Sequence, residues 1–210
     1  ESVMMAMLIA KAYGEIAELA RVTGDAALTE RLPARKAELA ERVNRTAFNG
    51  EYYVRAFSRF GVVGDRNDPN GGSIYVNPQS WAILSGIVPK DRLKSVLAAV
   101  DGMETEQGIP LCSPAYQRYD EHVGRMSGML PGVYENGGVY NHAGCFKVMA
   151  DCTLGRAEQA LATLRKILPD GECNPSALTT TEPYVFTNCY LKHPTVDMQV
   201  GFAWQTGTSA

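Results

Sequence analysis

Three short clusters of polar and aromatic residues could carry chemistry in this chain, and they lie at residues 77–81, 135–142 and 204–209. Together they supply amides, a carboxylate, an imidazole, two indoles and several hydroxyls. They contain neither a pair of acidic residues nor a Ser/His/Asp arrangement. Amides and carboxylates bind sugar hydroxyls, and an indole can cover the apolar face of a sugar ring. The clusters therefore predict a carbohydrate-binding site.

Two of these clusters also have features that suit an anion. His142 lies at the expected start of a helix, where unpaired N–H groups and the positive end of the helix dipole favour negative charge. The Thr-Gly-Thr-Ser run at 206–209 offers hydroxyl donors and a close backbone approach. An anion held by both would be of phosphate size. The alternatives are a capping or packed histidine at 142 and an ordinary helix cap at 206–209.

Other residues that could do chemistry have plainer interpretations. Trp81 lies on a helix face, where a tryptophan is more often part of the core than a sugar platform, whereas Trp204 stands beside the expected anion cradle. Asp65 and Asp68 lie in a Gly-rich loop and are expected to form turns through their own side chains. The segment 65–71 departs from a calcium-loop pattern, so no metal site is predicted.

The elements that must position these clusters are helices. Apolar periodicity and capping residues predict three helical hairpins. The expected helices run from Val3, from Asp25 to Asn49-Gly50, from an Asn77 N-cap to Gly86, from Pro89 through Val100, from an Asn141 N-cap to Gly155, and from Ala157 to Leu168. Irregular segments at 51–76, 102–140 and 169–210 separate them, the first with short strands. Hairpins alternating with long loops predict an all-α toroid with its site on the loop side.

Composition excludes several classes of protein. The chain has 210 residues, of which 45% are hydrophobic and 20% charged, as in ordinary folded proteins. A net charge of −3 without a long basic run argues against a nucleic-acid partner. An apolar stretch near the ~20 residues that a membrane span needs is absent, so no membrane partner is expected.

The cysteines bear on compartment. Five cysteines at irregular spacing, without a CxxC pair, favour neither a zinc site nor a disulfide framework. Cys145 and Cys152, seven residues apart in an apolar helical pattern, are expected to be small core residues. A reducing compartment, the cytoplasm, is therefore predicted.

The two ends of the chain suggest a piece of a longer protein. The first residue is Glu1, and apolar periodicity is already running at Val3 with no evident cap before it. The last residues, 206–210, are typical of the entry to a helix.

The sequence resembles the inverting glycoside phosphorylases, a family that includes cellobiose, cellodextrin, cellobionic acid and chitobiose phosphorylases. The resemblance covers nearly the whole chain and is carried by residues 1–3, 78–81, 135–142, 182–184 and 204–208, in that order. It implies a partial (α/α)6 toroid of helical hairpins, with long loops and short β elements. It also implies phosphorolysis of a β-linked glucosyl disaccharide, of cellobiose or cellobionic acid type, to α-glucose 1-phosphate.

The resemblance assigns roles to particular residues. Inorganic phosphate is the nucleophile in this family, so it replaces the second carboxylate that an inverting hydrolase uses to activate water. His142, Thr206 and Gly207 match the phosphate-binding positions. The substrate-binding positions are Glu135, which matches a sugar-binding glutamate, Asn188 near a sugar-binding glutamine, Tyr134 at an acceptor position, and Trp204 beside the cradle. Phosphate is a substrate here, and no cofactor is expected. The acceptor sugar stays open, although Arg118 and Arg125 could pair with an anionic one.

The family's other catalytic parts have no match in these residues. Its general acid, an aspartate in an Asp-Trp-Asn-Asp type motif, lies upstream of the segment that matches residues 1–3, as do a phosphate-binding arginine and a β-sandwich domain. We therefore expect residues 1–210 to be the C-terminal portion of the catalytic domain, inactive alone for want of the acid. The alternatives are an inverting toroid hydrolase and a non-catalytic carbohydrate-binding fragment. The resemblance is also compatible with a homodimer.

Overall fold

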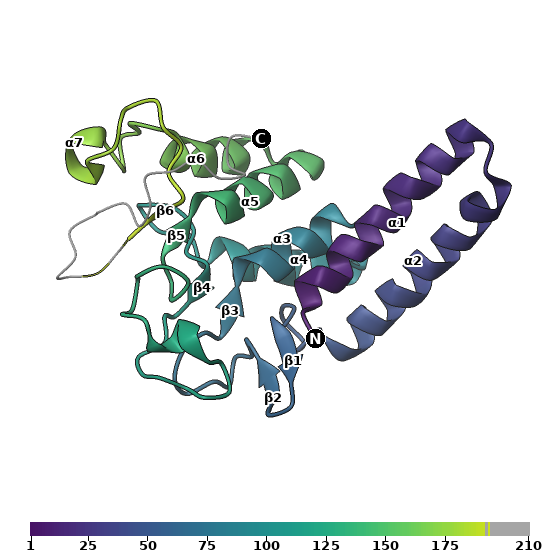
Figure 1. Cartoon of the computed structure of the whole chain (residues 1–210), viewed down its shortest axis with the longest axis horizontal. Coiled ribbons are helices and arrows are strands. Elements are labelled where there is room, and N and C mark those ends of the chain that lie inside the picture. Colours follow the sequence, from purple (N-terminus) through teal and green to yellow (C-terminus); the bar gives the residue numbers. More distant parts are fainter. Residues whose placement is uncertain (192, 194–210) are drawn as a thin grey trace.

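The computed structural model describes residues 1–191 and 193, and their dominant elements are helices in three hairpins (Figure 1). The helices are α1 (Val3–Thr23), α2 (Ala26–Thr46), α3 (Val76–Leu84), α4 (Lys90–Asp101), α5 (Asn141–Thr153), α6 (Ala157–Ile167), the short α7 (Ser176–Thr179) and a 3-10 turn at Arg125–Gly128. The predicted all-α class is confirmed.

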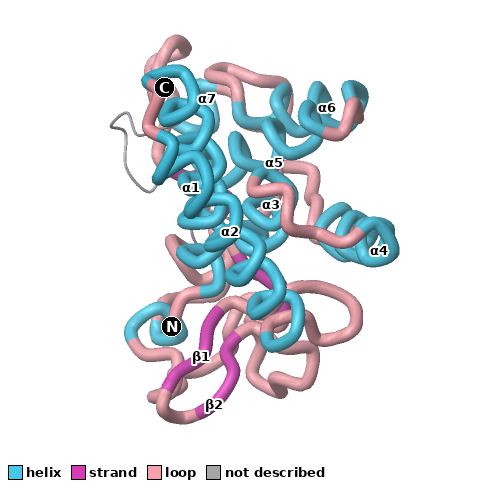
Figure 2. Tube along the Cα trace, turned by 90° about the vertical axis from the view of Figure 1, so that its right-hand side faces the viewer, coloured by secondary structure: helices cyan, strands magenta, loops and turns pink. Residues whose placement is uncertain are grey.

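Short antiparallel strand pairs tie the loops together. The strands are β1 (Ala56–Ser58), β2 (Gly61–Val63), β3 (Ile74–Tyr75), β4 (Cys112–Ser113), β5 (Val139–Tyr140) and β6 (Cys189–Tyr190), paired β1 with β2, β3 with β4 and β5 with β6. Figure 2 shows β1 and β2 with long loops at the lower end of the view and the helices above them. The loops thus gather outside the helical layer.

The helical hairpins pack in succession. The helix α1 contacts α3, α3 contacts α5, and α2, α4 and α6 each pack on their own hairpin partner. The main core lies among these helices and includes Met7, Tyr53, Ala82, Val96 and Ala150. This arrangement is consistent with the predicted partial toroid of helix pairs.

Both helices of the first hairpin have a side-chain N-cap, Ser2 for α1 and Asp25 for α2. Asp25 was expected to cap α2, and its Oδ1 accepts the Leu28 N–H at 3.0 Å. The absence of a cap on α1 was predicted wrongly, because the Ser2 hydroxyl accepts the Met5 N–H at 3.3 Å. The helix α2 ends at Thr46, before the expected Asn49-Gly50 stop, because Phe48 already pairs with Tyr53 in a β-bridge.

The predicted asparagine caps of α3 and α5 are wrong. Tyr75 and Tyr140 hold the N-cap positions with extended backbone and no side-chain cap, and both are the last residues of a strand. Each strand runs straight into its helix, so the N-cap residue comes from the strand. Asn141 is the first residue of α5, and its Nδ2 donates to the Thr187 carbonyl at 3.1 Å and hydroxyl at 3.0 Å.

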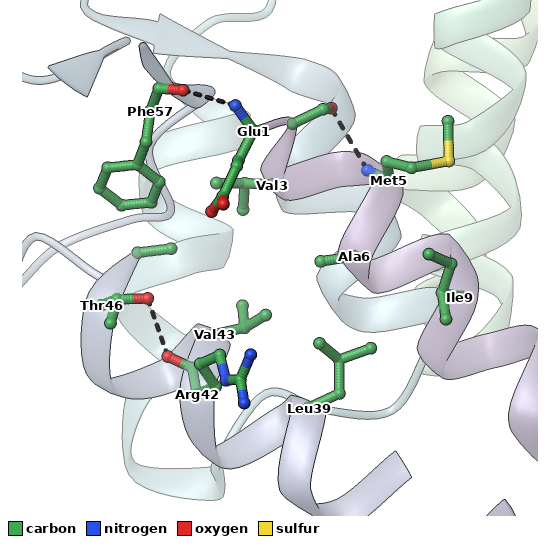
Figure 3. A pocket seen from close by; sticks show the side chains of 12 residues that line it. Glu1, Val3, Met5, Ala6, Ile9, Leu39, Arg42, Val43, Thr46 and Phe57 are labelled. Atoms are coloured by element: carbon green, nitrogen blue, oxygen red, sulfur yellow. Dashed lines mark hydrogen bonds between the residues drawn. The ribbon is translucent and has the colours of Figure 1, made fainter. Parts of the chain in front are cut away.

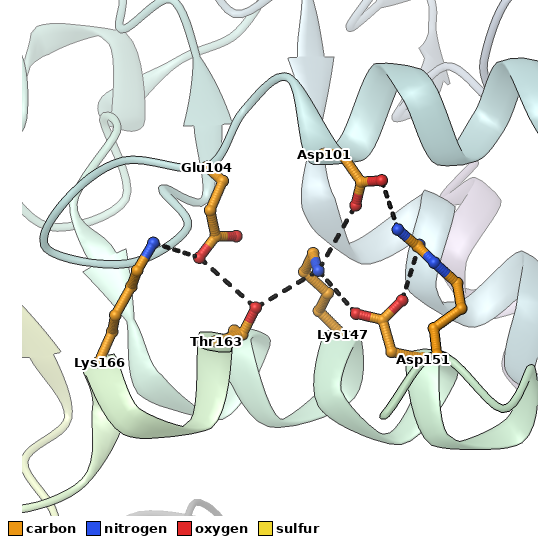
Figure 4. A network of polar contacts seen from close by, with 7 residues as sticks. Asp101, Glu104, Lys147, Asp151, Thr163 and Lys166 are labelled. Atoms are coloured by element: carbon orange, nitrogen blue, oxygen red, sulfur yellow. Dashed lines mark hydrogen bonds and ion pairs between the residues drawn. The ribbon is translucent and has the colours of Figure 1, made fainter. Parts of the chain in front are cut away.

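A buried network of charges joins α4, α5 and α6 (Figure 4). Lys147, 3% exposed, lies 2.7 Å from Asp151 Oδ2, and the other Asp151 oxygen lies 2.8 Å from Arg156. Arg156 also contacts Asp101 at 2.5 Å. Both oxygens of the 2% exposed Asp151 carboxylate are therefore paired with a cation, as burial of a charge requires.

The thiols do not follow the predicted core pattern throughout. Cys145 is half-buried but Cys152 is exposed, so the core interpretation is wrong for Cys152, whose side chain faces solvent near the C-terminal end of α5. Cys112 and Cys189 are the buried thiols. No disulfide joins any of the five, all of which lie in the described ranges. None of the helices within those ranges is long and apolar enough to cross a membrane.

Candidate active-site region

The loop before β5 presents Glu135 on a tight backbone turn. Gly137 has a φ of 85°, a left-handed conformation that favours glycine, and a Cβ on Gly138 would lie 2.5 Å from the Tyr134 carbonyl oxygen. The Gly138 N–H donates to that same oxygen at 2.9 Å. The two glycines thus permit a turn that leaves the Glu135 side chain exposed to solvent.

The pairing of β5 with β6 brings distant predicted residues together. Tyr140 lies opposite Cys189, and the Asn141 N–H donates to the Asn188 carbonyl oxygen at 3.1 Å. Asn188 therefore lies beside the first turn of α5, which carries His142. Tyr134 packs with Tyr140 against a small cluster that contains Val133, Cys189 and Leu191.

Four of the predicted site residues thus belong to one region: Tyr134, Glu135, His142 and Asn188. The other three, Trp204, Thr206 and Gly207, lie outside the described residues. Burial, reinforced by the nearby Cys189 and Glu135 side chains, raises the pKa of the Tyr140 hydroxyl above its usual range. That hydroxyl therefore stays protonated at neutral pH and can donate a hydrogen bond to the nearby Glu135 carboxylate.

His142 is the second residue of α5 and is half-buried. Its ring lies 4.5 Å from the ring of Phe146, one helical turn along, and Phe146 meets the Trp81 indole edge-on at 5.0 Å. The sequence interpretation missed Phe146, although its i, i+4 spacing from His142 is visible in the sequence. Trp81 packs against the main core, as its core interpretation predicted.

Several amides of the polar clusters do a structural task that sequence analysis did not predict. The Asn136 Oδ1 accepts the Tyr116 N–H at 2.7 Å, and its Nδ2 donates to the carbonyls of Tyr116 and Met129 at 2.9 and 2.8 Å. Gln79 bonds both backbone groups of Tyr53 in the same way, at 2.9 and 2.7 Å. The side chains of Asn136 and Gln79 bond the backbone of neighbouring loops as a β-strand partner would. Sugar binding is therefore not assigned to these two amides.

Other polar groups near α3 and α5 remain without a bond. Within residues 1–191 and 193, Asn77 Oδ1, Ser80 Oγ, Trp81 Nε1 and Asn141 Oδ1 are buried and have no hydrogen-bond partner. A buried polar group normally has a partner, because desolvation alone costs about 1–3 kcal/mol. The interior of the fold near the starts of α3 and α5 therefore contains polar atoms that lack hydrogen-bond partners in this part of the structure.

The remaining predicted groups follow their plainer interpretations. Asp65 Oδ1 accepts the Arg66 N–H and the Asn49 side-chain N–H, and Asp68 Oδ1 accepts the Asn70 N–H at 2.9 Å. The bonds to Arg66 and Asn70 are local, turn-forming bonds, and the bond from Asn49 ties this loop to the end of the first hairpin. Arg118 and Arg125 have exposed side chains.

A separate apolar cavity of about 420 Å³ lies between the first turns of α1 and the last turns of α2 (Figure 3). Val3, Ala6, Ile9 and Leu39 line it, and Arg42 stands at its side. None of the predicted site residues lines it, so it belongs to the α1–α2 hairpin and not to the region around β5.

Comparison with known proteins places the whole chain in one group. The model of the "Glycosyl hydrolase 94 superfamily, catalytic domain" matches residues 1–210. Solabiose phosphorylase of Paenibacillus borealis is 39% identical over all of this chain and 28% of its own length. A 3-O-beta-D-glucopyranosyl-beta-D-glucuronide phosphorylase of the same organism is 34% identical over 91% of this chain and 25% of its own. Cellobionic acid phosphorylase of Neurospora crassa is 35% identical over 60% of this chain and 16% of its own length. The chain spans about a quarter of the length of these relatives.

Proposed function

The chain belongs to the glycosyl hydrolase 94 superfamily, and from that we propose that residues 1–210 form the C-terminal part of the catalytic domain of a glycoside phosphorylase. The complete enzyme cleaves a β-linked glucosyl disaccharide with inorganic phosphate and inverts the anomeric carbon, which gives α-glucose 1-phosphate. Relatives named as phosphorylases of disaccharides support this proposal.

The observation that carries the proposal is the placement of His142, Glu135 and Asn188 around β5 and β6. The backbone N–H groups of the first turn of α5 and the positive end of the helix dipole lie toward the space beside His142. A phosphate held there accepts a hydrogen bond from the imidazole. Glu135 is exposed on its tight turn and can accept hydrogen bonds from sugar hydroxyls, and Tyr134 precedes it in the chain. Asn188 lies beside the first turn of α5.

The reaction follows from that placement. A phosphate oxygen forms a bond to the anomeric carbon of the glucosyl unit while the bond from that carbon to the leaving oxygen breaks. The leaving oxygen takes a proton from a general acid that we place outside this chain. His142 holds the nucleophile in line, which converts an encounter in solution into a reaction between neighbours. In this proposal Thr206 and Gly207 complete the phosphate grip, and Trp204 covers a sugar ring beside it.

We also propose a cytoplasmic location, because five cysteines without a disulfide suit a reducing compartment. The substrates are an oligosaccharide and inorganic phosphate, and a homodimer is compatible with the proposal. No cofactor is required in this scheme, since phosphate is itself a reactant.

The test is a phosphate-dependence assay of the complete polypeptide. Solabiose and cellobionic acid are incubated with it in phosphate buffer and in phosphate-free buffer; sugar phosphates are followed by phosphorus NMR and free sugars by proton NMR. We expect α-glucose 1-phosphate to form only with phosphate. Release of free glucose at the same rate in both buffers would favour the hydrolase alternative. The 210-residue chain serves as a control in which we expect no turnover.

A further inference from the structure

The ring of His142 is the outer member of a row of three aromatic rings that reaches into the core. Phe146 lies one turn along α5, at a ring distance of 4.5 Å and an interplanar angle of 48° from the imidazole. Residues four apart on a helix share a face, so Phe146 stands directly behind His142. The Trp81 indole of α3 also contacts Phe146, at 5.0 Å and 66°, in an edge-to-face arrangement.

The inner end of this row is fixed. Trp81 packs against the main core cluster, and α3 packs against α5 along the same faces. The start of α3 is held by Gln79, whose side chain bonds the backbone of Tyr53 and the Tyr75 carbonyl. The Trp81 indole, held in this way, therefore limits how far the Phe146 ring can turn away from His142.

An imidazole at a helix start has several staggered rotamers, and only some of them can direct a nitrogen at an anion before the first turn. Immobilising a side chain during binding costs about 2- to 10-fold in affinity. A ring already stacked against a fixed aromatic surface has lost that freedom before the ligand arrives.

We propose that Phe146, supported by Trp81, is a positioning residue that holds the His142 imidazole ready for phosphate. This inference rests on the proposed function, in which His142 binds phosphate. Phe146 contacts the imidazole, so its expected effect is on the phosphate side of the site.

The test is the affinity of the complete polypeptide for inorganic phosphate, measured by isothermal titration. We expect Phe146→Leu to weaken phosphate binding by about 3- to 10-fold, because leucine fills space without a ring face. Phe146→Tyr keeps the ring and should bind phosphate within about twofold of the native protein.

Phe48→Leu is the matched control. Phe48 packs against the same core cluster as Trp81, and its edge contact with Tyr53, at 5.4 Å, is comparable to that of Phe146 with Trp81. It should lower the midpoint of thermal unfolding as Phe146→Leu does and leave phosphate affinity unchanged. Equal loss of phosphate affinity in Phe48→Leu and Phe146→Leu would reduce the role of Phe146 to stability and overturn the inference.

His142→Ala separates the two levels of the proposal. If His142→Ala weakens phosphate binding and Phe146→Leu does not, the positioning role is wrong and the proposed function stands. If neither variant changes phosphate binding, or the native polypeptide binds none, the phosphate role of His142 fails and the positioning role fails with it.

Discussion

The two ends of α5 have opposite chemistry. Toward its C-terminal end, Lys147 and Asp151 are almost fully buried, and each Asp151 oxygen is paired with a cation at 2.7 or 2.8 Å. At its N-terminal end, Asn141 is fully buried, yet its Oδ1 has no hydrogen-bond partner in the described part of the chain, and the His142 ring lies against the ring of Phe146.

The difference separates a structural site from a candidate ligand site on one helix. Paired buried charges fix α5 against α4 and α6, because an unpaired charge there would be costly. A buried amide oxygen without a partner, such as Asn141 Oδ1, does not stabilise the fold, and the half-buried His142 imidazole beside it is the group that can reach a ligand. Substitutions at the first end should therefore change stability, and substitutions at the second should change binding.

The largest expected effect is at the paired end. Asp151→Ala leaves the buried Lys147 ammonium without its nearest carboxylate and should lower the free energy of unfolding by about 3–5 kcal/mol. Denaturant unfolding of the complete polypeptide measures this. A loss below about 1 kcal/mol would mean that water or Asp101 replaces the carboxylate and that this end is not a fixed anchor.

Asn136→Ala tests an amide that is satisfied although it lies in the predicted site cluster. Its removal leaves one N–H and two carbonyls of the backbone without partners, at a cost of about 1–3 kcal/mol in unfolding free energy. Asn141→Ala, measured alongside, removes an amide with an unbonded oxygen and should cost less. A larger loss at Asn141 would contradict the contrast between satisfied and unsatisfied amides.

The two thiols of α5 report on the two ends chemically. Burial raises the pKa of the Cys145 thiol, which lowers its thiolate fraction at pH 8, whereas Cys152 is exposed. We expect alkylation of Cys152 to be roughly tenfold faster. Peptide mapping by mass spectrometry gives both rates, and added inorganic phosphate should slow only Cys145. Equal protection of both thiols would point to a global stabilisation and not to a ligand at one end.

The smallest effect is expected at an ion pair on the surface. Glu41→Ala breaks the exposed contact of Glu41 with Arg45 in α2, at 3.3 Å, and should change the unfolding free energy by less than about 0.5 kcal/mol. It is the control for Asp151→Ala in the same titration. A loss comparable to that of Asp151→Ala would show that burial does not set the strength of these pairs.

The helices could be predicted from the sequence because apolar periodicity and the Asp25 cap are local features. The cap residues of α3 and α5 could not, because strands β3 and β5 run into these helices and supply Tyr75 and Tyr140 at the cap positions, where the sequence favoured asparagines. The side-chain amides of Gln79 and Asn136 form hydrogen bonds with backbone groups 26 and 20 residues away in the sequence, a separation that no local pattern encodes.

The candidate site divides in the same way. His142 and Glu135 stand in one cluster and could be recognised together, whereas the approach of Asn188 depends on the pairing of β5 with β6. The contact of Phe146 with His142 and the Lys147–Asp151 pair both have i, i+4 spacing, so they were visible in the sequence. What the sequence does not show is that the pair is buried and that α3 supports the ring.

The most direct test of this account is the phosphate dependence of disaccharide cleavage by His142→Ala in the complete polypeptide. Loss of a hydrogen bond to a charged ligand is worth about 1.5–3 kcal/mol, so the KM for phosphate should rise roughly 10- to 100-fold. The KM for the disaccharide and the free energy of unfolding should stay close to native values. An unchanged KM for phosphate, or an equal rise for both substrates, would contradict the assignment of the N-terminal end of α5 to phosphate.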